Sequence, residues 1–225
     1  MKNQRYLLCT FVLVSIMLSQ CTAPEVQPSA FEIHPAFQIE LAAAEPLVID
    51  PVDMEFDENG QAYVLEMPGY PLRDEESRIV QLTDQDNDGR FDQRKVFATD
   101  LRFATSLLPY DGGVLVAAPP DLLFLKDTDK DGVADQRETL MSGFADDNLQ
   151  HNFNGLTYGI DNWIYAANGG NGGRPYFIGK EEKKISIRGV DFRFNLKTKV
   201  IEIVGASSGG FEIAMDNYGR LFETH

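Results

Sequence analysis

The chain contains two near-copies of one acidic stretch, DQDNDGRFDQRKVF from Asp84 to Phe97 and DTDKDGVADQRETL from Asp127 to Leu140. The two copies begin 43 residues apart. A fixed period of about 20 to 50 residues is typical of repeat proteins such as propellers and solenoids. The sequence therefore indicates a protein built from similar units of secondary structure.

A second repeat overlays the first and consists of a turn followed by a strand-like run. Its four copies are FDENGQAYVLEM from Phe56, PYDGGVLVAAP from Pro109, YGIDNWIYAANG from Tyr158 and AMDNYGRLFETH from Ala214. The turn aspartates are spaced by 54, 50 and 55 residues and are Asp57, Asp111, Asp161 and Asp216. This spacing is close to the roughly 50 residues of a four-stranded propeller blade.

The fold class predicted by these repeats is all-β, a β-propeller. Short runs of β-branched and aromatic residues between Gly, Asp, Asn and Pro support the same class. About six blades would need roughly 300 residues. We therefore expect residues 31–225 to be the N-terminal part of the propeller, with the first three to four blades, and further chain after His225. We expect Trp163 to lie in the core between blades.

The first 20 residues are typical of an export signal. Lys2 and Arg5 precede the apolar run Tyr6–Leu18, which is too short to span a membrane and has the length of a signal-peptide core. Leu18-Ser19-Gln20-Cys21 resembles the lipobox of bacterial lipoproteins, in which the cysteine is acylated. We predict a lipoprotein signal peptide over 1–20, a tether over 21–30, and a periplasmic or cell-surface protein anchored by lipid at Cys21. An ordinary secretory signal cut nearby is the alternative.

Composition excludes several classes of function. The 35 acidic and 20 basic residues give a net charge of −15, so nucleic acid is a poor partner. The cysteines are Cys9, inside the signal core, and Cys21. The predicted domain therefore has no thiol for a disulfide, a zinc–cysteine site or a cysteine nucleophile, and no C-x-x-C-H haem motif.

Both acidic stretches have the spacing of an EF-hand-type calcium loop, because carboxylates at alternate positions of a tight turn can converge on one hard cation. In the second copy the predicted ligands are Asp127, Asp129, Asp131, the Val133 carbonyl, Asp135 and the closing Glu138. In the first copy they are Asp84, Asp86, Asp88 and Asp92. Lys95 stands where the first copy needs its closing glutamate, so we expect that site to be weaker. The alternative is an acidic hairpin that binds nothing tightly, since Asp, Asn and Gly are favoured in turns.

The segment Gln150–Asn154 is the candidate for chemistry, because it holds one histidine and three amides in five residues. An imidazole can take a proton near neutral pH, and neighbouring amides can orient it or hold a substrate oxygen. His151 is therefore the candidate base, and a merely polar loop is the alternative. A glycine-rich loop over 168–174 follows the next strand-like run, at the rim where propellers place their sites. Arg174 in this loop is a candidate contact for an acidic ligand.

These motifs resemble those of the soluble quinoprotein glucose/sorbosone dehydrogenase-like propellers, and among them the membrane-bound dehydrogenase domains of environmental bacteria. The resemblance runs from His34 onward. It rests on the paired acidic stretches and on VLEMPGYP from Val64, GGVLVAAPPDLLFLKDTDKDG from Gly112, HNFNGLTYGIDNWIYAANG from His151 and RGVDFRFN from Arg188.

The resemblance implies a propeller that holds pyrroloquinoline quinone and calcium and oxidises a sugar or other alcohol, passing electrons to a partner such as a cytochrome c. In this family a histidine before the strand takes the hydroxyl proton, and His151 matches it. We expect Asn152, Asn154 and Arg174 to contact the cofactor. Two alternatives remain: a non-catalytic calcium-binding propeller that binds carbohydrate or a protein, and a lactonase-like hydrolase. The hydrolase would need an axial metal, for which the candidate ligands are Glu66, Asn154 and Asn168.

Overall fold

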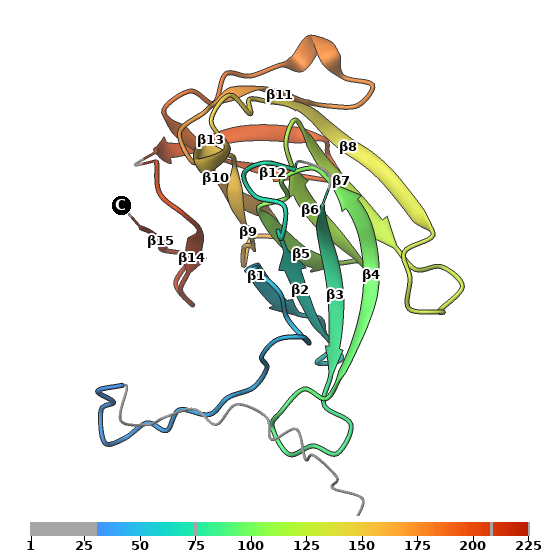
Figure 1. Cartoon of the computed structure of the whole chain (residues 1–225). Helices are drawn as coiled ribbons and strands as arrows, with labels where there is room; N and C mark the ends of the chain where they lie inside the picture. The colour runs from blue at the N-terminus through green and yellow to red at the C-terminus, as the bar shows by residue number, and fades with distance from the viewer. Residues whose placement is uncertain (1–30, 74–75, 208, 225) are drawn as a thin grey trace, which may run out of the picture. The chain divides into compact units, whose positions relative to one another are not determined.

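The computed structural model describes residues 31–73, 76–207 and 209–224, which form strands, turns and two short 3-10 helices, η2 (Leu149–His151) and η3 (Glu181–Lys183) (Figure 1). The all-β prediction is confirmed. The predicted signal peptide, Cys21 and the tether lie outside the described residues. Within those residues, no helix is long and apolar enough to cross a membrane.

Residues 31–41 form a part of their own. They contain no strand, and the backbone N–H of Phe37 closes a turn on the carbonyl of His34 at 2.9 Å.

Four antiparallel sheets follow one another along the rest of the described chain. The first contains β1 (Pro51–Phe56), β2 (Ala62–Glu66), β3 (Ser77–Thr83) and β4 (Gln93–Leu101). The second contains β5 (Ser106–Tyr110), β6 (Gly113–Ala118), β7 (Asp121–Lys126) and β8 (Gln136–Phe144). The third contains β9 (Asn154–Tyr158), β10 (Ile164–Ala167), β12 (Val190–Asn195) and β13 (Val200–Ala206). The fourth is the hairpin of β14 (Ile213–Met215) and β15 (Leu221–Glu223).

The repeated turn aspartates lie between the first and second strands of each sheet, as the sequence predicts. In two of these turns the aspartate carboxylate closes the turn: Asp57 Oδ1 accepts from the backbone N–H groups of Asn59 and Gln61 at 2.8 and 2.9 Å. Asp216 Oδ1 repeats this contact with the N–H groups of Tyr218 and Arg220, both at 2.9 Å. In these two copies, an aspartate at this position stabilises the turn by satisfying two backbone donors.

Apolar layers separate neighbouring sheets. Between the second and third sheets, Phe144 and Phe153 stack with ring centroids 3.7 Å apart. Between the third sheet and the β14–β15 hairpin, Tyr165 and Ile213 are buried and Trp163 packs against them, as predicted. Strand β6, between β5 and β7 in the second sheet, is buried along its whole length. Each sheet therefore depends on its neighbour to cover its faces.

The first strands of successive sheets, β1, β5, β9 and β14, lie side by side (Figure 1). The same kind of side-chain to backbone hydrogen bond joins each to the next. A polar side chain on or just inside one first strand accepts a hydrogen bond from the backbone of the next. Asp53 Oδ2 accepts from the N–H of Leu107 at 2.7 Å. Ser106 Oγ accepts from Leu156 at 3.0 Å, and Asn154 Oδ1 accepts from Glu212 at 2.7 Å. These bonds set the lateral order of the sheets.

Strand β11 (Gly173–Phe177) departs from the regular repeat. It lies in sequence between β10 and β12 of the third sheet, yet it pairs with β8 as the fifth strand of the second sheet. The pairing sets Phe177 opposite Met141 and Gly173 opposite Phe144. The glycine-rich loop is consequently held at one end by the third sheet and at the other by the second.

Candidate functional site

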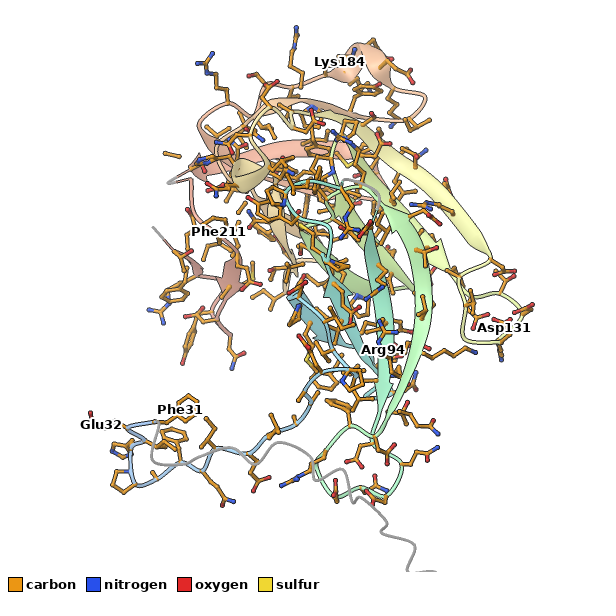
Figure 2. The ribbon with its side chains drawn as sticks, in the orientation of Figure 1. Phe31, Glu32, Arg94, Asp131, Lys184 and Phe211 are labelled. Atoms are coloured by element: carbon orange, nitrogen blue, oxygen red, sulfur yellow. The ribbon has the colours of Figure 1, made fainter. Side chains whose placement is uncertain are left out.

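A cavity with a volume of about 850 Å³ opens where the first strands of the sheets begin. Its wall combines β1, the segment after β2, the residue before β5, and the segments before β9 and β14. Aliphatic and aromatic side chains alternate with amides, hydroxyls and one carboxylate. The lining residues are Val52, Met67, Tyr70, Thr105, Leu149, Gln150, His151, Asn152, Asn154, Gly209, Phe211, Glu212 and Thr224. Figure 2 labels Phe211 beside β14. A cavity of this size can enclose a small organic molecule.

His151 lies in this wall at the end of η2, with its ring exposed. Its Nδ1 lies 2.7 Å from the carbonyl oxygen of Gly169. Because a carbonyl can only accept, Nδ1 must carry the hydrogen in this bond. In the neutral ring Nε2 then keeps its lone pair and is the atom able to accept a proton.

The glycine-rich loop packs too closely on His151 for any side chain. Gly169 has φ +70°, and a Cβ on it would lie 2.2 Å from the carbonyl oxygen of Asn152. A Cβ on Gly170 would lie 2.7 Å from His151 Nδ1. Only glycine combines these positive φ values with such an approach. The loop therefore orients the imidazole through its backbone.

The amides near His151 differ in how fully their side chains are hydrogen-bonded. Asn154 donates from Nδ2 to the carbonyl of Asn152 at 3.0 Å and accepts from Glu212. Asn168, in the loop, donates to the Ile187 carbonyl at 2.7 Å and accepts from Gly172 at 2.8 Å. Both side chains hold backbone segments in place. Asn152 is different, since only one end of its amide is hydrogen-bonded.

Two further predicted site residues are not part of the cavity wall. Arg174 is exposed on β11 and is not among the described lining residues. Glu66, at the end of β2, is fully buried against Arg78 and Arg94. Together with the bonds of Asn154 and Asn168, these contacts leave the hydrolase alternative without an assembled axial ligand set among the described residues.

An acidic group on β1 and before β14 was not singled out from the sequence. Glu55 is half-buried, and burial first, then the charges of Asp53 and Glu212, raise its pKa from 4.5 to about 7. Burial also raises the pKa of Asp53, although hydrogen bonds from Leu107 and Ser106 oppose it. Glu212 has φ +66°, a conformation that is strained for a residue with a side chain. The sequence has no local pattern that predicts this acidic group. Its members come together only because the first strands of different sheets lie side by side.

The raised pKa of Glu55 predicts a pH-dependent stability. Its stabilising contribution is complete below pH 4.5 and is lost as pH rises through about 7, since the folded state favours the protonated carboxyl. Glu55→Gln removes this loss. Allowing for solvent screening, we expect the free energy of unfolding of the variant to exceed that of the wild type by on the order of 1 kcal/mol at pH 8. The two values should be equal at pH 4. Denaturant unfolding at both pH values checks this, and an equal difference at both would contradict it.

The acidic stretches form the β3–β4 and β7–β8 hairpin loops, and Figure 2 labels Asp131 in the second. In each loop one carboxylate oxygen from each of three aspartates lies within 4.8 Å of the others; the groups are Asp84, Asp86, Asp88 and Asp127, Asp129, Asp131. Such a set of oxygen ligands suits calcium.

The remaining predicted calcium ligands have other contacts. Asp135 accepts from the N–H and hydroxyl of Thr128 at 2.7 and 2.6 Å, and Asp92 accepts from Gln85 at 3.3 Å. Val133 donates its N–H to Asp131 Oδ1 at 2.8 Å. Glu138 is exposed on β8, where it lines a separate hollow with Tyr110. These residues close or flank the loops, and the structure does not bring Glu138 into the oxygen group.

Burial raises the pKa of Asp127, but hydrogen bonds from the Gly132 and Lys130 N–H groups, both at 2.7 Å, outweigh it and lower the pKa below its usual value. Lys95 of the first stretch extends to the second loop, where its Nζ would lie 2.6 Å from a Cβ on Gly132. The ammonium group of Lys95, on β4, therefore lies beside the β7–β8 loop.

Comparison with known proteins gives a family and a fold. The family model described as "Domain of unknown function (DUF7133)" matches residues 23–225. The holo pyranose dehydrogenase PQQ domain from Coprinopsis cinerea is similar, with 12% identity, a TM-score of 0.55, and coverage of 78% of this chain and 43% of that one. A Trichoderma reesei enzyme of carbohydrate-active family AA12 has 15% identity, a TM-score of 0.49, and coverage of 80% and 50% respectively. No curated protein sequence matches. The chain therefore spans half or less of the length of these two structures. Its fold is similar to that of the pyranose dehydrogenase PQQ domain.

Proposed function

This chain belongs to the DUF7133 family, and we propose that it is part of an exported quinoprotein-type dehydrogenase that oxidises a sugar or another alcohol. The observation that carries the proposal is His151: it lies in the wall of the large cavity with Nδ1 bonded to Gly169 and Nε2 left to accept a proton. The fold likeness to a pyranose dehydrogenase PQQ domain supports the same reaction class.

In this proposal the complete protein is a β-propeller of about six blades, related to the glucose/sorbosone dehydrogenase-like propellers. The first three sheets are its first blades, and β14–β15 begins the fourth. Lipid on Cys21 holds it on the outer side of a bacterial membrane, and a cytochrome c receives the electrons.

The chemistry assigned to this chain is removal of the hydroxyl proton. The O–H bond of the alcohol breaks and its proton binds His151 Nε2, while the Gly169 carbonyl holds the ring in the required tautomer. Formation of the carbonyl also requires loss of a hydride from carbon, and a quinone is the class of two-electron acceptor that would take it.

The described cavity wall suits a neutral alcohol better than the quinone named by the resemblance. Pyrroloquinoline quinone carries three carboxyl groups, whereas the described lining residues include Glu212 and neither lysine nor arginine. Like charges at close range are unfavourable. We therefore assign the described wall to the alcohol and derive no step at the quinone.

The test uses the full-length protein. Dye reduction is measured with pyrroloquinoline quinone and calcium present, over a panel of sugars, alcohols and lactones. Quinone-dependent oxidation of a sugar or alcohol is expected. Saturable sugar binding without turnover would identify a binding module instead, and lactone hydrolysis would identify a hydrolase.

We also propose that the β7–β8 loop binds calcium through Asp127, Asp129 and Asp131, with a weaker site in the β3–β4 loop. Calcium at about 100 times its dissociation constant stabilises the folded state by roughly 2.7 kcal/mol. We expect Asp129→Asn with Asp131→Asn to abolish most of the calcium-dependent rise in the melting midpoint. The matched pair Asp86→Asn with Asp88→Asn should remove a smaller part. Equal midpoints with calcium and with a chelator in the wild type would disprove both sites.

A further inference from the structure

The side chain of Asn152 is held rigidly in the cavity wall. It is 2% exposed and lies between η2 and β9. Phe153, the next residue, is anchored in the core by its stacking on Phe144. The preceding residue, His151, donates to Gly169 from its ring and accepts from the Asn171 N–H at 3.0 Å through its carbonyl. Asn152 is thus fixed from both sides.

The orientation of its amide follows from Asn171. Asn171 Nδ2 donates to the carbonyl of Asn148 at 2.8 Å, and its Oδ1 accepts from the Asn148 N–H at 3.2 Å. The Asn171 atom that faces Asn152 at 3.0 Å is therefore a nitrogen donor, and the Asn152 atom opposite must be the acceptor Oδ1. The NH₂ end of Asn152 must then be the end that is turned away from Asn171.

That NH₂ group has no hydrogen-bond partner within the described part of the chain. A buried donor that gave up its bonds to water without replacing them destabilises the folded state. Such groups are rare in proteins and call for an explanation, of which a bound ligand or water is one. Asn152 lies in the wall of the same cavity as His151.

We infer that Asn152 is a specificity-determining residue that recognises the oxygen of the ligand's hydroxyl group, an inference that rests on the proposed function. Two consecutive residues of the cavity lining carry complementary groups: His151 Nε2 can accept a hydrogen, and Asn152 Nδ2, a buried donor without a partner in the described chain, can donate one. A hydroxyl group satisfies both at once. An ether or a deoxy position satisfies one or neither.

This arrangement also favours the reaction over binding alone. When the O–H bond breaks and the proton binds Nε2, the ligand oxygen gains negative charge. A preoriented N–H donor binds that oxygen more strongly than it binds the neutral hydroxyl. Asn152 transfers no proton and no electrons. It orients the oxygen and stabilises its charge.

The test is ligand binding, read without turnover. The side-chain amide resonance of Asn152 is followed by NMR while the full-length protein is titrated with D-glucose, its monodeoxy analogues and the rest of the assay panel. We expect a saturable shift with hydroxyl ligands, and an affinity about 10- to 100-fold lower for the one analogue that lacks the recognised hydroxyl.

Variants complete the test. Asn152→Asp keeps the acceptor for Asn171 and removes the donor, and Asn152→Ala removes both. Each should erase the discrimination between the parent ligand and that analogue. Asn195→Asp, the same change at the end of β12 and outside the cavity lining, is the control for charge. No saturable shift with any panel compound, or equal weakening of parent and analogue, overturns the inference. Hydroxyl-selective binding without dye reduction would sustain it while refuting the proposed oxidation.

Discussion

His151→Asn is expected to lower kcat for alcohol oxidation by about 10²- to 10⁴-fold, the usual contribution of a positioned general base. Asparagine places its Nδ2 where the histidine has Nδ1, so the bond to the Gly169 carbonyl can be retained. What the variant lacks is Nε2, the atom that receives the proton. The change therefore separates loss of the base from collapse of the loop.

Three measurements make this result decisive: kcat and KM by dye reduction, and the melting midpoint. We expect kcat to fall while the midpoint stays close to that of the wild type, because the ring of His151 is exposed. His34→Asn is the control, since His34 is exposed and lies outside the cavity wall. A His151→Asn enzyme that retains kcat within about tenfold would exclude the base role.

Local chemistry explains what could be predicted from the sequence. The turn aspartates are recognisable because Asp57 and Asp216 each satisfy two backbone donors within their own turn, as Asp57 does with Asn59 and Gln61. The acidic loops were recognisable for the same reason, with Asp127 accepting from the N–H groups of Lys130 and Gly132. His151 was found as a dense polar segment before a strand, and it does lie in the cavity.

Features that depend on contacts between distant segments could not be predicted from the sequence. The pairing of β11 with β8 depends on an edge left open in another sheet, which no local pattern records. The raised pKa of Glu55 arises first from burial, then from the charges of Asp53 two residues away and of Glu212 more than 150 residues later. Arg174 was predicted at the cavity because it follows the glycines, but β11 directs its backbone into the second sheet.

Glu66→Gln is expected to destabilise the protein by about 3–5 kcal/mol, the cost of breaking a buried ion pair. Glu66 is 0% exposed, and its Oε2 accepts from Arg78 Nε at 2.6 Å and Arg94 Nη2 at 2.7 Å. Its Oε1 accepts from the N–H of Ile49 at 2.9 Å. Glutamine retains one oxygen for Ile49 but turns an NH₂ group toward two guanidinium groups. Two partly buried cations then lose their counter-charge.

Glu76→Gln is the matched control, because Glu76 forms an exposed ion pair with Arg73 at 3.0 Å. Surface pairs of this kind contribute roughly 0–1 kcal/mol, so this variant should unfold almost as the wild type does. Equilibrium denaturation of both variants gives the comparison. Similar, small losses for the two would mean that water already screens the Glu66 group.

The ion pairs of Glu66 help to hold one part of the cavity wall in place, because Glu66 immediately precedes the lining residue Met67. An acid that is neutralised by two arginines has no need of a metal ion. We therefore expect a chelator to leave the difference between Glu66→Gln and wild type unchanged, whereas it should weaken the protein through the aspartate loops. A chelator that abolished the difference would instead make Glu66 a metal ligand and restore the hydrolase alternative.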